Sequence, residues 1–446
     1  MDFMERVRSS QILRLLTVGF FALLLQIPIA MIGGQVHERQ ARGVEAAMEV
    51  SSKWGNQQFI TGPVLVVPYT YRWVEKQRKD KVIEEIEHIE ARAAAFLPDS
   101  LDIRAVAANE TRQRGIFSVP VYRLDLTVTG RFSRPDFADL SVEPLAIAWE
   151  RMHLVIGIAD TRAIQKETAV TWSGTPVPFL PGTGSFQDAE SGIHTPVGFP
   201  AGTDSVEFSL PLELNGSQGI FFAPFGQSTT VDLKSNYPHP SFQGNWLPGE
   251  RSVSDGGLEA KWSIPFLGRN YPQSWTSTGE LREAIDASRF GVAFLNPVDH
   301  YRMAERSVKY AALFILLTFA TLWLFEVRAG MRVHPIQFLM LGGALCLFYL
   351  LLLALSEHIA FLLAYVLASV AVIGMVAAYG IVVLRGLHRA LAVASGVALL
   401  YAYLYVLLVN EDYALLMGSI GLFLILGLIM YATRGIDWYS VSRTRE

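Results

Sequence analysis

Six long apolar stretches stand out along the chain, one near the N-terminus and five within the last 140 residues. A helix needs about 20 mostly apolar residues to span the ~30 Å hydrocarbon core of a bilayer. The pattern therefore predicts six transmembrane helices, at residues 13–33, 308–327, 336–355, 359–380, 390–409 and 413–432. The chain is predicted to be an integral membrane protein.

The first apolar stretch has two interpretations. Basic residues precede it, as in a cleaved signal peptide, but its apolar run exceeds the ~7–15 residues of a signal h-region and no clear A-x-A site follows. A retained signal anchor is the better interpretation. Pro28 is expected to kink this helix, because proline lacks the N–H of an internal helical hydrogen bond.

Between the first and second apolar stretches, the spacing of apolar residues changes from the helical period to the alternation typical of strands. Residues 123–132 and 206–215 alternate apolar and polar side chains, as in antiparallel strands with one face on a core. Pro211, on the polar face, predicts an edge or a bulge. Further strands are expected at residues 62–73, 101–108, 147–158, 229–233, 258–266 and 290–297. The predicted fold is a membrane α-helical bundle with an inserted, external, antiparallel β-sandwich-like domain.

Two segments depart from the strand pattern. Residues 35–52 have helical spacing and are expected to continue the first helix outward. Residues 75–91 are dense in charge, and their pattern fits either a surface helix or a charged hairpin.

Basic residues are distributed unequally between the two sides of the membrane. Two connections, 356–358 and 410–412, contain no Lys or Arg, whereas basic residues occupy every connection and terminus on the other side. These are Arg6, Arg8, Arg14, Arg328, Arg332, Arg385, Arg389, Arg434, Arg443 and Arg445. The Lys/Arg bias of short loops sets topology, so both termini are predicted to be cytoplasmic. The expected domains are a cytoplasmic tail and signal-anchor helix at 1–33, an external β-rich domain at 34–307, and a five-helix bundle with a cytoplasmic tail at 308–446.

Composition agrees with a mixed membrane and soluble chain. Hydrophobic residues make up 51%, charged residues 17%, and the mean hydropathy is +0.31. The net charge of −4 gives no reason to expect a nucleic-acid partner. The one cysteine, Cys346, falls within a predicted span, so the external domain has no internal disulfide.

Catalytic and metal-binding motifs are lacking in the sequence. The nine histidines show no H-x-x-x-H or H-E-x-x-H spacing, and there are no cysteine pairs. A nucleophile elbow, a phosphate-binding loop and a dinucleotide fingerprint are also absent. We therefore expect a protein that is not an enzyme and has no cofactor or metal. A hydrolase would need convergent acids or a His–Ser pair in the folded domain.

The predicted spans favour packing over transport. Their interiors hold no ionisable residue, which coupled transporters usually keep, and Glu326 is expected to remain hydrated at a helix end. Small residues recur at four-residue spacing, which lets helix backbones approach closely. These pairs are Ala364/Ala368, Gly374/Ala378, Ala392/Gly396 and Ala394/Ala398. Lipid or solute handling through the bundle remains the alternative function.

The two external connections contain candidate docking residues, Glu357, His358, Glu411 and Asp412. We hypothesise that the acids dock the external domain onto the bundle, and His358 is of the type that titrates near neutral pH. The competing interpretation is helix capping, with Ser356 and Asn410 as N-caps of the following spans.

Two turn-rich loops, at 173–204 and 235–257, are candidate recognition segments. Trp246 and nearby Trp275 could anchor a protein or glycan partner, since aromatic side chains bring large contact area at low entropic cost. The favoured alternative is that these aromatics fill the ends of the sandwich or lie against the membrane.

Several segments together resemble the CreD inner membrane proteins. They are 62–69 (GPVLVVPY), 114–122 (RGIFSVPVY), 347–349 leading to 356–359 (SEHI), 410–419 (NEDYALLMGS), Tyr431 and 437–439 (DWY). The resemblance covers nearly the whole chain in order. It implies a Gram-negative inner membrane protein with a periplasmic domain, associated with envelope integrity, colicin tolerance and β-lactam responses. It supplies no catalytic residues and no cofactor. The expected role is therefore to support envelope integrity or an envelope stress response by binding an envelope component or partner protein.

Overall fold

The computed structural model describes residues 11–79, 82–138, 140, 142–276, 279–294, 300–329 and 333–434. Arg6, Arg8, Arg332, Arg443, Arg445 and residues 437–439, used above, lie outside this set. The chain folds as two compact units. The membrane unit comprises residues 1–44 and 298–446, and the domain unit comprises residues 45–297.

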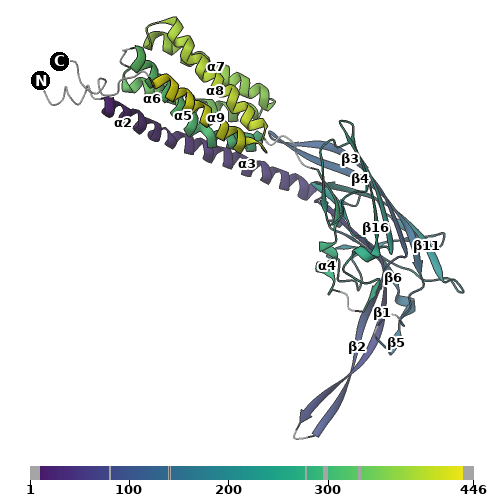
Figure 1. Cartoon of the computed structure of the whole chain (residues 1–446). Coiled ribbons are helices and arrows are strands. Elements are labelled where there is room, and N and C mark those ends of the chain that lie inside the picture. The colour runs from purple at the N-terminus through teal and green to yellow at the C-terminus, as the bar shows by residue number, and fades with distance from the viewer. Residues whose placement is uncertain are drawn as a thin grey trace. The chain divides into compact units, whose positions relative to one another are not determined.

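The membrane unit is helical, and six helices are long and apolar enough to span a bilayer, as predicted. The first span combines α2 (Gln11–Leu24) and α3 (Gln26–Trp54). The others are α5 (His300–Ala329), α6 (Pro335–Ser356), α7 (Phe361–Val383), α8 (Leu387–Val409) and α9 (Ala414–Thr433) (Figure 1). The first span is interrupted at Leu25. Pro28 has no N–H to donate to the carbonyl of Leu24, the last residue of α2.

Close packing in the bundle involves only some of the predicted small pairs. Ala364 and Ala368 are fully buried on α7. By contrast, a Cβ added to Gly374 or Gly396 would meet no atom within 4 Å. Spacing alone does not reveal which face of a helix meets a neighbour, so these two glycines are open sites in this unit.

Glu326 differs from its expected environment. Its residue exposure is only 6%, and its carboxylate accepts a hydrogen bond from the Val333 N–H at 3.3 Å. Val333, just before α6, is itself buried. The expectation of a hydrated carboxylate was therefore wrong.

The domain unit contains two sheets (Figure 1). The first has the order β14 (Pro240–Gly244), β18 (Phe290–Phe294), β12 (Gly219–Phe222), β1 (Gln58–Lys79), β6 (His153–Ile158), β10 (Gly192–Pro196) and β9 (Leu180–Pro181). Also in it are β2 (Val82–Phe96), which pairs with β1 and with β17 (Ser274–Trp275), and β5 (Ala146–Ile147), which pairs with β1.

The second sheet has the order β15 (Glu250–Ser254), β16 (Gly257–Pro265), β13 (Ser228–Ser235), β3 (Ser100–Arg114), β4 (Phe117–Ser133), β11 (Ser205–Ser217), β7 (Ala169–Trp172) and β8 (Thr175–Pro178). The short helices are η1 (Trp149–Arg151), η2 (Thr161–Ala163), η3 (Phe266–Gly268) and α4 (Arg282–Ala287).

The inserted β-rich domain is confirmed, and its two sheets are mixed rather than antiparallel throughout. β1 runs parallel to β12, and β3 runs parallel to β13. Each parallel pair joins strands more than 100 residues apart, and single-strand alternation carries no information about such partners. The predicted loops at 173–204 and 235–257 likewise contain strands, from β8 to β10 and from β14 to β15.

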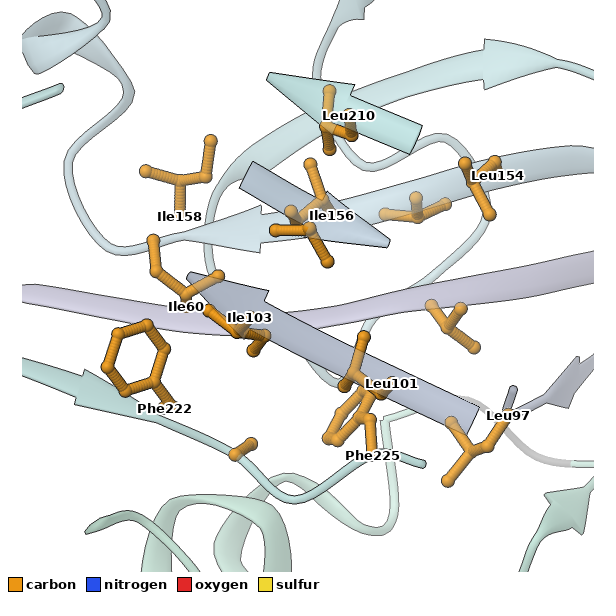
Figure 2. Close-up of a cluster of buried hydrophobic side chains, with 14 of the residues drawn as sticks. Ile60, Leu97, Leu101, Ile103, Leu154, Ile156, Ile158, Leu210, Phe222 and Phe225 are labelled. Atoms are coloured by element: carbon orange, nitrogen blue, oxygen red, sulfur yellow. The ribbon is translucent and has the colours of Figure 1, made fainter. Parts of the chain in front are cut away.

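The domain core lies between the sheets. Figure 2 shows Leu154 and Ile156 of β6 in one cluster with Ile103 of β3 and Leu210 of β11. These side chains alternate along their strands with residues that face the other way, as the sequence pattern predicted.

The charged segment 75–91 is a hairpin. β1 and β2 stay in antiparallel register from Leu65↔Phe96 to Lys79↔Val82, which selects the hairpin from the two interpretations. Pro211 lies in an unbroken register with β4, while β7 pairs with β11 only at Phe208 and Ser209. Pro211 therefore occupies a strand edge, without a bulge.

Candidate functional site

A groove of about 840 Å³ opens on the domain unit. It lies on the face of the first sheet opposite the core: Leu154 points into the cluster of Figure 2, so His153 points away from it. His153 is opposite Val66 of β1 and Pro196 of β10, and His194 is opposite Val155. The two imidazole rings meet edge to face, with centroids 5.7 Å apart.

The floor of this groove is made of small side chains. Pro68 of β1 is paired with Ala93 of β2, and Ala91 lies on the same face as Ala93. Alternating alanines on a strand leave the space that larger apolar residues would fill. We call the site the histidine groove, defined by Arg151, His153, Ser185, Gln187, His194 and this alanine floor.

One wall is the segment 182–188, fixed at its far end by Asp188. The Asp188 carboxylate is buried and accepts hydrogen bonds from Trp275 Nε1 at 3.0 Å, Gly279 N at 2.8 Å and Leu281 N at 2.9 Å. Phe186 is buried in the core. The wall residues Ser185 and Gln187 thus belong to a firmly anchored segment.

Gly184 allows this wall to approach His153. Its φ is +59°, and an added Cβ would lie 2.6 Å from His153 Nε2. Glycine meets both requirements, because it tolerates positive φ and has no side chain.

His153 has a defined tautomer. Its Nδ1 lies 3.1 Å from the Arg151 carbonyl oxygen, which can only accept, so Nδ1 bears the proton. Nε2 then accepts from the Ser185 backbone N–H at 3.4 Å and lies 3.3 Å from Ser185 Oγ. Burial lowers the pKa of His153, and the hydrogen bond to the Arg151 carbonyl opposes that shift. His153 is a neutral acceptor at neutral pH.

The charges around the groove are unequally partnered. Glu90 and Arg92 line its β2 edge and bond each other, at 2.8 Å between Arg92 Nη2 and Glu90 Oε2. Arg151 is exposed, and within the described part of the chain its guanidinium has no carboxylate partner. His194 donates from Nδ1 to the Gly182 carbonyl at 2.8 Å, since that oxygen can only accept. Its Nε2 has no partner among the described residues.

The His153–Ser185 contact is the pair that a hydrolase would need. Its Nδ1 partner is a backbone carbonyl, whereas a catalytic triad places a carboxylate there. Nε2 also receives the Ser185 N–H, which competes for the lone pair that would take a hydroxyl proton. The described residues contain no group of three metal-ligand side chains. We interpret the His153–Ser185 contact as structural, since it holds segment 182–188 against β6.

The predicted docking residues lie in the membrane unit. The Glu357 side chain is 8% exposed, accepts a hydrogen bond from Tyr301 Oη at 3.1 Å, and lies 3.6 Å from Arg39 Nε. Because Arg39 belongs to α3 and Tyr301 to α5, this acid links the two helices that precede and follow the domain unit along the chain. His358 is exposed, and its side chain has no partner within the described ranges.

Within the described residues, the ion pairs of Glu411 are with two arginines of α5. Its carboxylate lies 3.5 Å from Arg302 Nη2 and 3.3 Å from Arg306 Nη1, and 52% of its side chain is exposed. Arg306 also donates to the carbonyls of Leu407 and Leu408 at the end of α8. Asp412 is exposed.

Neither Ser356 nor Asn410 is an N-cap. Ser356 Oγ bonds the Leu353 carbonyl within α6, and Asn410 Nδ2 bonds the Val406 carbonyl at the end of α8. The N-caps of α7 and α9 are Ala360 and Tyr413. Both polar residues complete the preceding helix, so the capping interpretation was wrong.

Comparison with known proteins gives two concordant matches. The profile of "Inner membrane protein CreD" matches residues 10–439. The protein of that name from Escherichia coli (strain K12) is 33% identical over 424 residues, covering 94% of this chain and 92% of the relative. The chain belongs to the CreD family. It is a multi-pass inner membrane protein, and the family description names no catalytic activity.

Solved structures add no functional argument for this CreD-family chain. An M1 zinc metallopeptidase from Deinococcus radiodurans gives a TM-score of 0.19 at 10% identity, covering 38% of each chain. A substrate-bound mutant of the M1 zinc metallopeptidase from the same organism gives 0.22 at 8% identity, covering 49% of this chain and 54% of the other. Both scores are too low to indicate a common fold.

The two predicted tryptophans lie in different environments. Trp275 is 7% exposed, packs on Phe186 and bonds Asp188, so it offers no exposed surface to a partner. That position corrects the recognition hypothesis for Trp275. Trp246 is half-buried, and its carbonyl accepts from Trp262 Nε1 at 3.1 Å.

Sequence reasoning missed the histidine groove. His153 and His194 are 41 positions apart and come together only because β6 pairs with β10. The four alanines among residues 91–95 were a usable signal, since alanine is depleted in strands.

Proposed function

We propose that this CreD-family protein supports envelope integrity by binding a component of the envelope through its extramembrane domain. The observation that carries the proposal is the histidine groove. It combines an anchored wall, an apolar floor and a guanidinium with no carboxylate partner among the described residues, in a volume typical of small-ligand sites, ~300–1,000 Å³.

The proposed orientation places both termini in the cytoplasm and residues 34–307 in the periplasm, as the distribution of Lys and Arg between loops favours. Single cysteines in a Cys346→Ala background test it. A membrane-impermeant maleimide should label Ile116→Cys in cells with a permeabilised outer membrane. It should label His388→Cys only after the inner membrane is opened. The reverse pattern would invert the topology.

Lipid or solute handling through the bundle has less support. The threonines of α5 bond carbonyls of their own helix, Thr318 to Phe314 and Thr321 to Leu317, and Tyr365 of α7 donates to the Tyr401 carbonyl of α8. A cavity between α5, α6, α7 and α8 has a volume of only about 20 Å³. These features suit an anchor.

Photo-crosslinking in living cells tests the binding function. A photoreactive amino acid at Gln187, in the groove wall, should give a discrete adduct with an envelope component. The matched control is Leu267, which is exposed elsewhere on the domain. Adducts of equal pattern at both sites, or none at Gln187, would contradict binding through the groove.

A further inference from the structure

We infer that the histidine groove binds an anionic group, a phosphate or a carboxylate carried on a small polar body, with Arg151 as its principal cation. This inference rests on the proposed function and names the chemistry of its ligand. It starts from the balance of charge around the groove.

Glu90 and Arg92 neutralise each other at the β2 edge. By strand alternation their side chains leave the face that carries Ala91 and Ala93. The remaining charged group of the lining is Arg151, because His153 is neutral and buried. A guanidinium with no carboxylate partner among the described residues offers its planar, fork-like donors to a carboxylate or phosphate.

His153 positions this cation. Its Nδ1–H holds the carbonyl of Arg151 itself, while its Nε2 is held by the wall at Ser185. The backbone that carries the guanidinium is thereby tied to the wall on the other side of the groove. His153 acts as a positioning residue, and Arg151 contacts the ligand.

The other polar groups can complete an anion site. The hydroxyl of Ser185, the amide of Gln187 and the hydroxyl of Thr276 line the same groove. His194 Nδ1 donates to the Gly182 carbonyl, and its Nε2 has no partner among the described residues. Glu90, Arg92, Arg151, His153 and His194 are the titratable groups lining the groove.

The floor limits the body of the ligand. Ala91, Ala93 and Pro68 present methyl and methylene groups without an aromatic platform. Such a floor accommodates a compact body of about monosaccharide size, and the anionic group supplies the specificity.

Equilibrium dialysis of the full chain in detergent micelles, at constant ionic strength, tests this inference. The probes are radiolabelled glucose 1-phosphate, galacturonate and glucose. Both anionic probes should bind saturably and compete with each other, and glucose should not bind. Arg151→Gln should weaken anion binding at least about tenfold, the effect of losing one charge-assisted hydrogen bond.

Two variants separate specific from general effects. Arg104→Gln removes a cation of the same domain whose side chain is exposed on the other sheet, and should leave binding unchanged. His153→Asn keeps a donor near the Arg151 carbonyl and should weaken binding less than Arg151→Gln.

The inference is overturned if glucose binds as well as the anions, if neither anion binds, or if Arg104→Gln and Arg151→Gln have equal effects. If a Gln187 adduct then persists in the Arg151→Gln background, the proposed binding function stands and only the inference of an anionic ligand fails. Absence of any Gln187 adduct would remove the proposed function itself.

Discussion

The Glu357 cluster and the histidine groove use similar side chains in opposite ways. At Glu357 an acid, a guanidinium and a phenol meet one another, and the acid is nearly buried. In the groove a guanidinium, two imidazoles and a hydroxyl surround open space, and the guanidinium has no acid among the described residues. Satisfied polar groups stabilise a fold, whereas unsatisfied ones at an opening are available to a ligand.

This contrast also locates the two roles in the chain. The Glu357 contacts lie within the membrane unit and join α3 to α5, the helices on either side of residues 45–297. The groove belongs entirely to the domain unit. Substitution of Glu357 is therefore expected to act through stability, and substitution of Arg151 in the groove through binding.

The largest expected effect follows from closing the groove with Gly184→Ala. The new methyl group would clash with His153 Nε2, and the left-handed φ adds strain, so we expect a loss of about 2–4 kcal/mol. Urea unfolding of the full chain in micelles, followed by tryptophan fluorescence, measures it. Gly202→Ala is the control, because Gly202 has φ +77° and open space around its Cβ. Equal losses in both variants would mean that the clash with His153 is unimportant.

Glu357→Ala should have the next largest effect. It leaves the Tyr301 hydroxyl without this acceptor and Arg39 without its acid, with an expected cost of about 1–3 kcal/mol. Because Arg39 is partly exposed, solvent screens its ion pair with Glu357, and that pair contributes only a small part of the cost. Amide hydrogen-exchange rates in α3 and α5 would measure this loss of stability. Exchange rates unchanged in both helices would contradict the role of Glu357 as a link between them.

A pH effect on the domain should be smaller. The folded state lowers the pKa of His153, so the unfolded chain binds this proton more readily. Stability from His153 is present above its ordinary pKa of about 6.5 and is lost as pH falls below that value. His153→Gln should flatten the pH dependence of unfolding below about pH 6.5. The same slope in both proteins would show that other groups cause it.

Particular residues show how far the sequence could predict this molecule. The six spans and most strands followed from local periodicity, because burial on one face imposes a period of 3.6 or 2. The sequence singled out Glu357 and Glu411, but local periodicity did not predict which residues these acids contact. Arg39, Tyr301, Arg302 and Arg306 are more than 50 positions away from the acids they contact. The groove was harder still, since it depends on the pairing of β6 with β10 and on an anchored wall whose buried acid, Asp188, has no local signature.

The smallest effect is expected for Glu411→Gln, which sharpens the comparison within the membrane unit. Glu411 is half-exposed, and Arg306 retains its two carbonyl acceptors on α8 when the acid is neutralised. Exposed ion pairs contribute about 0.2–1 kcal/mol, so we expect a loss within that range, measured by the same hydrogen-exchange assay.

Glu357→Gln combined with Glu411→Gln tests whether the two acids together hold the domain in a functional arrangement. The double variant should lose more than the sum of the singles if both brace α5, since Tyr301, Arg302 and Arg306 lie within two turns of that helix. Strict additivity would show two independent contacts, and unchanged stability together with full envelope integrity in cells would end the docking hypothesis.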